Sequence, residues 1–175
     1  MEVNYMKTKW WKTPQVNVIW TLIRIWLGIQ WVTAGWGKIT GGFEVNGFLQ
    51  GAIAKAGGEM PIVQGWYAGF LENFALPNTG LFNVLVPWGE LLIGIGLILG
   101  AATIPALIAA AFMNLNFLLA GTISTNPEYL ALEVILLFVG VGSYYWGIDR
   151  FAIPAIKAYF TKENQNTELE KPIAV

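Results

Sequence analysis

The chain alternates long apolar blocks with shorter polar segments. The first block covers 16–36 and contains one charged side chain, Arg24. As a helix it would be about 30 Å long, which is the thickness of the hydrocarbon core of a bilayer. Three more apolar blocks cover 84–101, 106–121 and 129–146. The pattern therefore predicts an all-α integral membrane protein built as a bundle of four spanning helices.

The segment 39–82 between the first two blocks is rich in glycine and mixed in polarity. Two parts of it, 45–56 and 61–74, have the apolar spacing of short helices that lie on a membrane interface. We therefore expect a long outer loop that contains short interfacial helices. The predicted regions are an N-terminal lead at 1–15, a four-span membrane domain at 16–154 and a tail at 155–175 that begins as an amphipathic helix and ends in a charged segment.

Basic residues gather beside the two ends of the predicted membrane domain: Lys7, Lys9, Lys12, Arg150, Lys157 and Lys162. The connections 102–105 and 122–128 contain neither Lys nor Arg. Basic residues favour the cytoplasmic side of a membrane. We therefore expect a multi-pass protein of the cell membrane with both termini in the cytoplasm and with 39–82 on the outer side.

The composition agrees with a membrane protein, because 55% of the residues are hydrophobic and only 12% are charged. A soluble domain has roughly twice that charged fraction. The net charge of −1 gives no basic footprint for nucleic acid. The chain has no Cys and no His, so by itself it offers no disulfide, thiol relay, ordinary haem ligand or zinc site. We expect no metal site.

Arg24 is the residue of the first block that most needs a partner. A charged group at the centre of a spanning helix costs about 2.5–3.5 kcal/mol on insertion scales. Glu90 and Glu133 lie in other apolar blocks, and the sequence leaves open which of them pairs with Arg24. Such a pair serves equally well as a structural clasp between helices or as part of a ligand site.

Further polar side chains lie in or beside the predicted spans. Asn114 and Asn116 are expected near mid-membrane, either at the site or in ordinary hydrogen bonds between helices. Lys38 lies at the outer end of the first span, where it is either an interface anchor or part of the site. The positive charge of Arg24 and Lys38 would suit a small anion or the polar head of a quinone. The tryptophans Trp26, Trp31 and Trp36 are expected to be belt and packing residues.

Motifs that contain these polar residues run through most of the chain, from about 16 to 154. They are Arg24-x-x-x-Gly28, Ala34-Gly35-x-Gly37-Lys38, Gly47-Phe48-Leu49, Pro87-x-Gly89-Glu90-Leu91-x-x-Gly94-x-x-Leu97-x-x-Gly100, Met113-Asn114-x-Asn116-Phe117, Ala120-Gly121-Thr122, Asn126-Pro127 and Gly147-x-Asp149-Arg150. In this order they resemble the DoxX family, and within it the DoxD-like subunits of thiosulfate:quinone oxidoreductase. The resemblance implies a membrane bundle of four helices.

The resemblance also implies a redox function, because members of this family are associated with the oxidation of reduced sulfur compounds and the transfer of electrons to membrane quinone. We therefore expect a component of a membrane oxidoreductase. Arg24, Lys38, Asn114 and Asn116 would bind the sulfur anion or the quinone, and Glu90 or Glu133 would handle protons. Quinone is the expected cofactor, and a second redox subunit or a further copy of the chain is an expected partner.

Two other classes of function remain open from the sequence. The first is a non-catalytic membrane protein that binds a lipid, a carrier or a partner protein through the outer loop or the tail. The second is an anion channel or transporter. It is less favoured because the four blocks show no inverted repeat, although a dimer could supply the missing helices.

Overall fold

The computed structural model describes residues 13–169, with side chains described as far as residue 162. These residues are helical apart from short turns, and they include no strand. The helices are α1 (Pro14–Gly41), α2 (Val45–Ala54), α3 (Gly65–Phe70), η2 (Leu71–Ala75), η3 (Leu76–Asn78), α4 (Thr79–Leu99), α5 (Thr103–Leu119), α6 (Asn126–Val139), α7 (Val141–Tyr144) and α8 (Asp149–Leu169).

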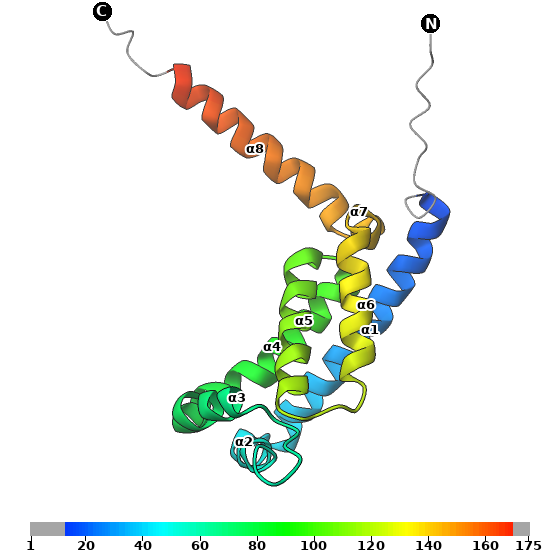
Figure 1. The fold of residues 1–175 in the computed structure, drawn as a ribbon. Helices are drawn as coiled ribbons and strands as arrows, with labels where there is room; N and C mark the ends of the chain where they lie inside the picture. The colour runs from blue at the N-terminus through cyan, green and yellow to red at the C-terminus, as the bar shows by residue number, and fades with distance from the viewer. Residues whose placement is uncertain (1–12, 170–175) are drawn as a thin grey trace, which may run out of the picture.

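Four helices form the body of the molecule. Helix α1 packs along α4 and also contacts α6 and α7, while α5 packs between α4 and α6 (Figure 1). The buried core of this body is made by apolar side chains from all four helices, among them Leu27, Leu97, Leu107 and Leu136. The predicted all-α class is confirmed within the described residues.

The contact between α1 and α4 is close because glycines face each other across it. A Cβ on Gly94 would lie 2.5 Å from the backbone nitrogen of Val32, and a Cβ on Gly28 would lie 2.8 Å from the carbonyl oxygen of Gly94. Farther along the same contact, a Cβ on Gly35 would lie 2.6 Å from the nitrogen of Leu91. Small residues of this kind let two helix backbones approach closely, as in membrane proteins.

The outer surface of the body is apolar. Large hydrophobic side chains on α1, α4, α5 and α6 are exposed, including Leu22, Leu92, Phe112 and Phe138. Two helical stretches in the described chain, Pro14–Gly41 and Gly65–Leu99, are long and apolar enough to cross a membrane, and Thr103–Leu119 is apolar but shorter. Polar groups inside and apolar groups outside are the arrangement expected in lipid.

The predicted outer loop is shorter and more helical than expected. Helix α1 continues to Gly41, and α4 begins at Thr79. Helices α3, η2 and η3 run into α4 without a break, so Gly65–Leu99 is one long helix with a π-helical turn at Leu71–Ala75. Helices α2 and α3 pack on each other as a cap with its own apolar core, in which Leu49 and Tyr67 are buried.

The last part of the chain also departs from the expected ranges. The fourth block, 129–146, is not one helix, because Gly140 has φ +62° and ψ −116° and separates α6 from α7. Only glycine adopts this backbone conformation readily. Helix α8 then continues to Leu169, well into the expected charged segment. Residues 1–12 of the predicted lead, which include Lys7, Lys9 and Lys12, and residues 170–175 lie outside the described part of the chain.

Candidate functional site

Three polar residues of α1 share one face of the helix. Arg24, Trp31 and Lys38 are spaced by seven residues, which brings them back to nearly the same direction after two turns. Each of them reaches a different neighbour: Arg24 the end of α7, Trp31 helix α6, and Lys38 helix α4. Helix α1 therefore carries three polar connections, stacked along its length.

Arg24 makes the first connection, at the end of the body where α4 and α7 terminate. Its side chain is 1% exposed. Nη1 donates to the carbonyl oxygen of Ser143 and Nη2 to that of Trp146, both at 3.0 Å. A Cβ on Gly100, just after α4, would lie within contact of Nη1, so glycine is required for the guanidinium to fit. Carbonyls at helix C-termini carry partial negative charge and suit a cation.

Asp149 belongs to the same group as Arg24, at the end of the body where α4 and α7 terminate, and this end and group are called inner. Its carboxylate accepts hydrogen bonds from the backbone N–H groups of Ala102 (2.8 Å) and Thr103 (2.6 Å) at the start of α5. An anion at a helix N-terminus is favourable. Asp149 also interacts electrostatically with Arg24. The inner group thus places a cation at helix C-termini beside an anion at a helix N-terminus.

The predicted pairing of Arg24 with Glu90 or Glu133 is wrong. Glu90 pairs with Lys38, and Glu133 accepts hydrogen bonds from Asn114 and Trp31. Lys38 is fourteen residues beyond Arg24, so the two connections are separated by about 21 Å along α1. The guanidinium instead donates to two backbone carbonyls at its own level and feels the charge of Asp149, while its buried Nε has no hydrogen-bond partner among the described residues.

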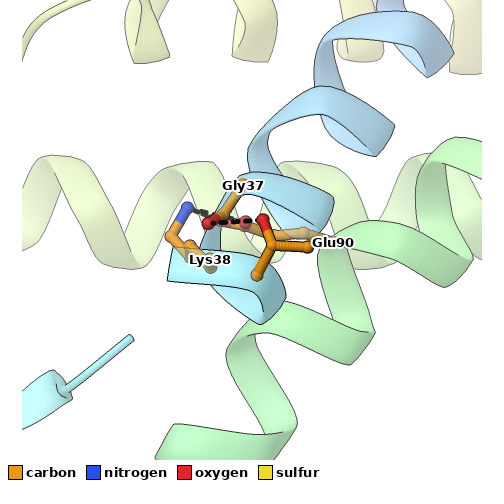
Figure 2. A network of polar contacts seen from close by, with 4 residues as sticks. Gly37, Lys38 and Glu90 are labelled. Carbon is orange, nitrogen blue, oxygen red and sulfur yellow. Dashed lines mark hydrogen bonds and ion pairs between the residues drawn. The ribbon is translucent and has the colours of Figure 1, made fainter. Parts of the chain in front are cut away.

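Lys38 and Glu90 make the outermost connection (Figure 2). The Lys38 ammonium lies 2.7 Å from Oε2 and 2.9 Å from Oε1 of Glu90, and the two residues come from the facing helices α1 and α4. The carboxylate is buried, whereas the Lys38 side chain is 27% exposed. Lys38 also lies 5.8 Å from the centre of the Phe43 ring. The pair joins α1 to α4 at the end of the body that lies next to the cap.

Glu133 makes the central connection and is 0% exposed. Nδ2 of Asn114 donates to its Oε1 at 2.9 Å and to its Oε2 at 3.0 Å, and Nε1 of Trp31 donates to Oε1 at 3.1 Å. No cation forms an ion pair with Glu133 among the side chains that the structure describes. The carboxyl can therefore gain or lose a proton without breaking an ion pair, which Glu90 cannot do.

A partly buried pair of polar side chains lies beside Glu133. Tyr129 is one turn before Glu133 on α6, and its hydroxyl donates to Oε1 of Gln30 at a long 3.4 Å. The edge of Trp26 meets the Tyr129 ring, with 5.6 Å between the ring centres. Since Trp26 is exposed on the apolar surface, these residues connect the lipid-facing side of the body to the Glu133 region.

Asn116 is apart from Asn114, although the two were predicted together. Its Oδ1 accepts a hydrogen bond from the hydroxyl of Tyr67 at 3.0 Å, and its Nδ2 donates to the carbonyl of Phe112. Asn116 therefore ties α5 to α3 of the cap. The predicted site residues divide into an inner group, a central group, an outer pair and this separate contact.

Several residues of these groups were not among the predicted ones. Trp31 was expected to be a belt or packing residue but is buried and binds Glu133, whereas Trp26 and Trp36 are exposed. The seven-residue spacing of Arg24, Trp31 and Lys38 was the feature of the sequence that could have indicated that Trp31 lies on the same helix face as the two cations. Asp149 stood in a family motif without an assigned role. Ser143 and Trp146 contribute carbonyls, which every residue has, so no pattern could single them out.

An all-helical body with an apolar outer surface and buried polar groups defines the class of this chain: it is a membrane protein. A scan against protein-family models matches DoxX over residues 19–122, which is more than half of the chain. The chain belongs to the DoxX family. The matched range includes Arg24, Lys38 and Glu90 but ends before Glu133. A search of curated proteins and a search of solved structures each found no match.

Proposed function

We propose that the body crosses the bilayer four times, by α1, by α4, by α5 and by α6 with α7. Residues Thr103–Leu119 and 126–144 would be about 25 Å and 28 Å long as helices, which suffices when flanking residues adapt. The start of α1 and the start of α8 lie at the same end of the body (Figure 1). Arg150, Lys157 and Lys162 follow at that end, so both termini are assigned to the cytoplasm.

We further propose that the protein is a component of a membrane oxidoreductase that passes electrons from a small reduced sulfur compound, such as thiosulfate, to membrane quinone. The redox class rests on the DoxX family and on the DoxD-like motifs. Reduction of a quinone takes up two electrons and two protons. The observation that carries the proposal is Glu133, a fully buried carboxyl held by neutral donors and free of any ion pair within the described chain.

The surroundings of Glu133 suit a quinone head better than those of the other groups. The hydroxyl of Tyr129 is held by one long hydrogen bond to Gln30, so it can turn to another acceptor at little cost. Trp26 offers an apolar ring on the lipid side of Tyr129. Tyr129 would donate a hydrogen bond to the quinone carbonyl, and Glu133 would exchange a proton one turn away.

Of the other predicted site residues, Asn114 keeps a role in this proposal, whereas Glu90 and Arg24 do not have the roles predicted for them. Asn114 would hold Glu133 in place. Glu90 would balance Lys38 and take no part in proton exchange. Arg24 is already bound to two carbonyls, so a sulfur anion would have to be bound elsewhere, near the partly exposed Lys38 or on a partner subunit. A partner would also have to supply any thiol or haem ligand, because the chain has no Cys and no His.

The test is quinone reduction by thiosulfate in membranes that contain the protein, followed by the absorbance change of the quinone. Glu133→Gln removes the exchangeable proton while keeping the size of the side chain, and we expect the rate to fall about 100-fold or more. Glu128→Gln is the matched control, because Glu128 lies on the same helix and is exposed. A wild-type rate in Glu133→Gln would contradict the proton role.

A second candidate function is a non-catalytic membrane component that binds a lipid, a carrier or a partner protein. The observation in its favour is that Arg24, Lys38 and Glu90 all have partners within the chain, as expected of helix clasps. Extraction of bound organic molecules from the purified protein separates the two candidates. A purified sample without quinone that leaves added quinone oxidised in the presence of thiosulfate would favour the second.

A further inference from the structure

Helix α8 leaves the body at its inner end and extends away from it (Figure 1). Its first residue is fixed, because the Asp149 carboxylate binds the N-terminus of α5 and the Asp149 N–H donates to the carbonyl of Gly100 at 2.8 Å. Beyond this anchor no other helix packs extensively on α8 within the described residues. The helix is thus held at one end and open along its length.

The open part of α8 has an apolar stripe. Ile153, Ile156 and Phe160 follow at intervals of three and four residues, which places them on one side of the helix, with Tyr159 at its edge. Ile156 is 54% exposed and Phe160 is 57% exposed. By helical geometry Ala158 and Thr161 lie on other sides of the helix. An exposed apolar stripe of this kind is expected to contact lipid or another protein surface.

Basic side chains flank the stripe and indicate what covers it. Lys157 lies beside Ile156, and Arg150 precedes the stripe with its guanidinium 4.3 Å from the centre of the Tyr145 ring. Trp146 and Ile148 are exposed just before α8, so the apolar surface of the body continues into the helix. Aromatic and basic residues next to an apolar stripe are characteristic of a helix at the lipid headgroups.

We propose that α8 lies along the membrane surface next to the inner end of the body, with Ile153, Ile156 and Phe160 among the acyl chains. Arg150 and Lys157 then meet the phosphates of anionic lipids. A second copy of α8 is a poorer cover, because its own Lys157 would approach the first as a like charge. Pro154 lacks an N–H group to bond to the carbonyl of Arg150, so the helix can bend there to follow the surface.

The proposal depends on the membrane location of the family and not on the role of Glu133, so either can fail without the other. The test uses the full chain, which has no Cys and therefore accepts single cysteines without further changes. Ile156→Cys and Phe160→Cys place a bimane fluorophore on the stripe. Ala158→Cys and Thr161→Cys are the controls. The labelled proteins are reconstituted in vesicles of phosphatidylcholine and phosphatidylglycerol.

We expect brominated lipid to quench the two stripe positions at least about twofold more than the two controls, and aqueous iodide to quench the controls more. Lys157→Glu should reduce the lipid quenching at position 156, and this loss should be larger when phosphatidylglycerol is present. Equal iodide quenching at all four positions would overturn the proposal. Stripe positions that resist both quenchers and crosslink between copies would also overturn it, in favour of a second copy.

Discussion

At the scale of single residues, Arg24 has the most demanding position. Its guanidinium is buried and donates to two carbonyls that belong to residues near the end of the chain. Arginine is suited to this because its planar fork offers several fixed donors, whereas lysine has one nitrogen on a flexible stem. The position therefore depends on the shape of the side chain as well as on its charge.

Arg24→Lys is expected to lower the free energy of unfolding by about 1–3 kcal/mol, because one buried carbonyl loses its partner. The measurement is unfolding in mixed micelles by titration with a denaturing detergent. Arg150→Lys is the control, since Arg150 is exposed and stacks on Tyr145. Arg150→Lys should lower the free energy of unfolding by less than about 1 kcal/mol. Equal stability of Arg24→Lys and the wild type would contradict the description of the inner group.

The sequence indicated that Arg24 needed a partner but could not identify it. Searching the sequence for residues of opposite charge leads to Glu90 and Glu133. Residue type identifies a carboxylate, whereas every residue has a backbone carbonyl, so the sequence does not single out the carbonyls that bind Arg24. The carbonyls of Ser143 and Trp146 become available only because Gly140 breaks the last apolar block and turns α7 toward α1. Asn114 and Glu133 were expected within apolar blocks, and both are buried, but their contact with each other depends on helix rotation, which the sequence does not specify.

At the scale of elements, α1 organises the body through a regular seam. Positions 17, 21, 24, 28, 31 and 35 are all buried and alternate in steps of four and three residues. From Arg24 onward the seam alternates between side chains that form hydrogen bonds, Arg24 and Trp31, and glycines that allow close approach, Gly28 and Gly35. The helices themselves were predictable from the apolar blocks. The continuous helix from Gly65 into α4 was not, since glycines and polar residues at 65–80 are typical of a loop.

Gly94→Ala is expected to destabilise the protein by about 1–3 kcal/mol, because the added Cβ would meet the backbone of Val32 at 2.5 Å. Gly37→Ala is the matched control. Gly37 also lies in a helix, but its Cβ would meet no atom within 4 Å. Gly37→Ala should leave the free energy of unfolding unchanged or raise it by up to about 1 kcal/mol. The prediction fails if the two substitutions have the same effect on detergent-induced unfolding.

At the scale of the whole molecule, the inner and outer ends differ in character. The inner end holds Arg24, Asp149 and the start of α8, and the outer end holds the Lys38–Glu90 pair and the cap of α2 and α3. In the proposed topology the cap faces outward and α8 faces the cytoplasm. The apolar blocks and basic flanks suggested this arrangement, but the separate core of the cap could not be read from its mixed composition.

Single cysteines test this topology in the Cys-free chain. Glu59→Cys, in the turn between α2 and α3, should react with a membrane-impermeant maleimide added outside intact cells. Thr161→Cys should react only after the membrane is opened or in inverted vesicles. Both positions are exposed, so a difference in labelling reports the side of the membrane. Labelling of both from the same side would exclude an odd number of crossings between α8 and the cap.

The contact between Arg24 and Ser143 joins residues that are 119 positions apart. A ribosome delivers the first of them to the bilayer long before the second exists. During most of its synthesis the nascent protein therefore contains an Arg24 guanidinium without its carbonyl partners, and the insertion machinery or water must solvate it. A chain that ends before Ser143 would leave the guanidinium without either carbonyl, so we expect such truncated copies to insert less stably than the finished protein.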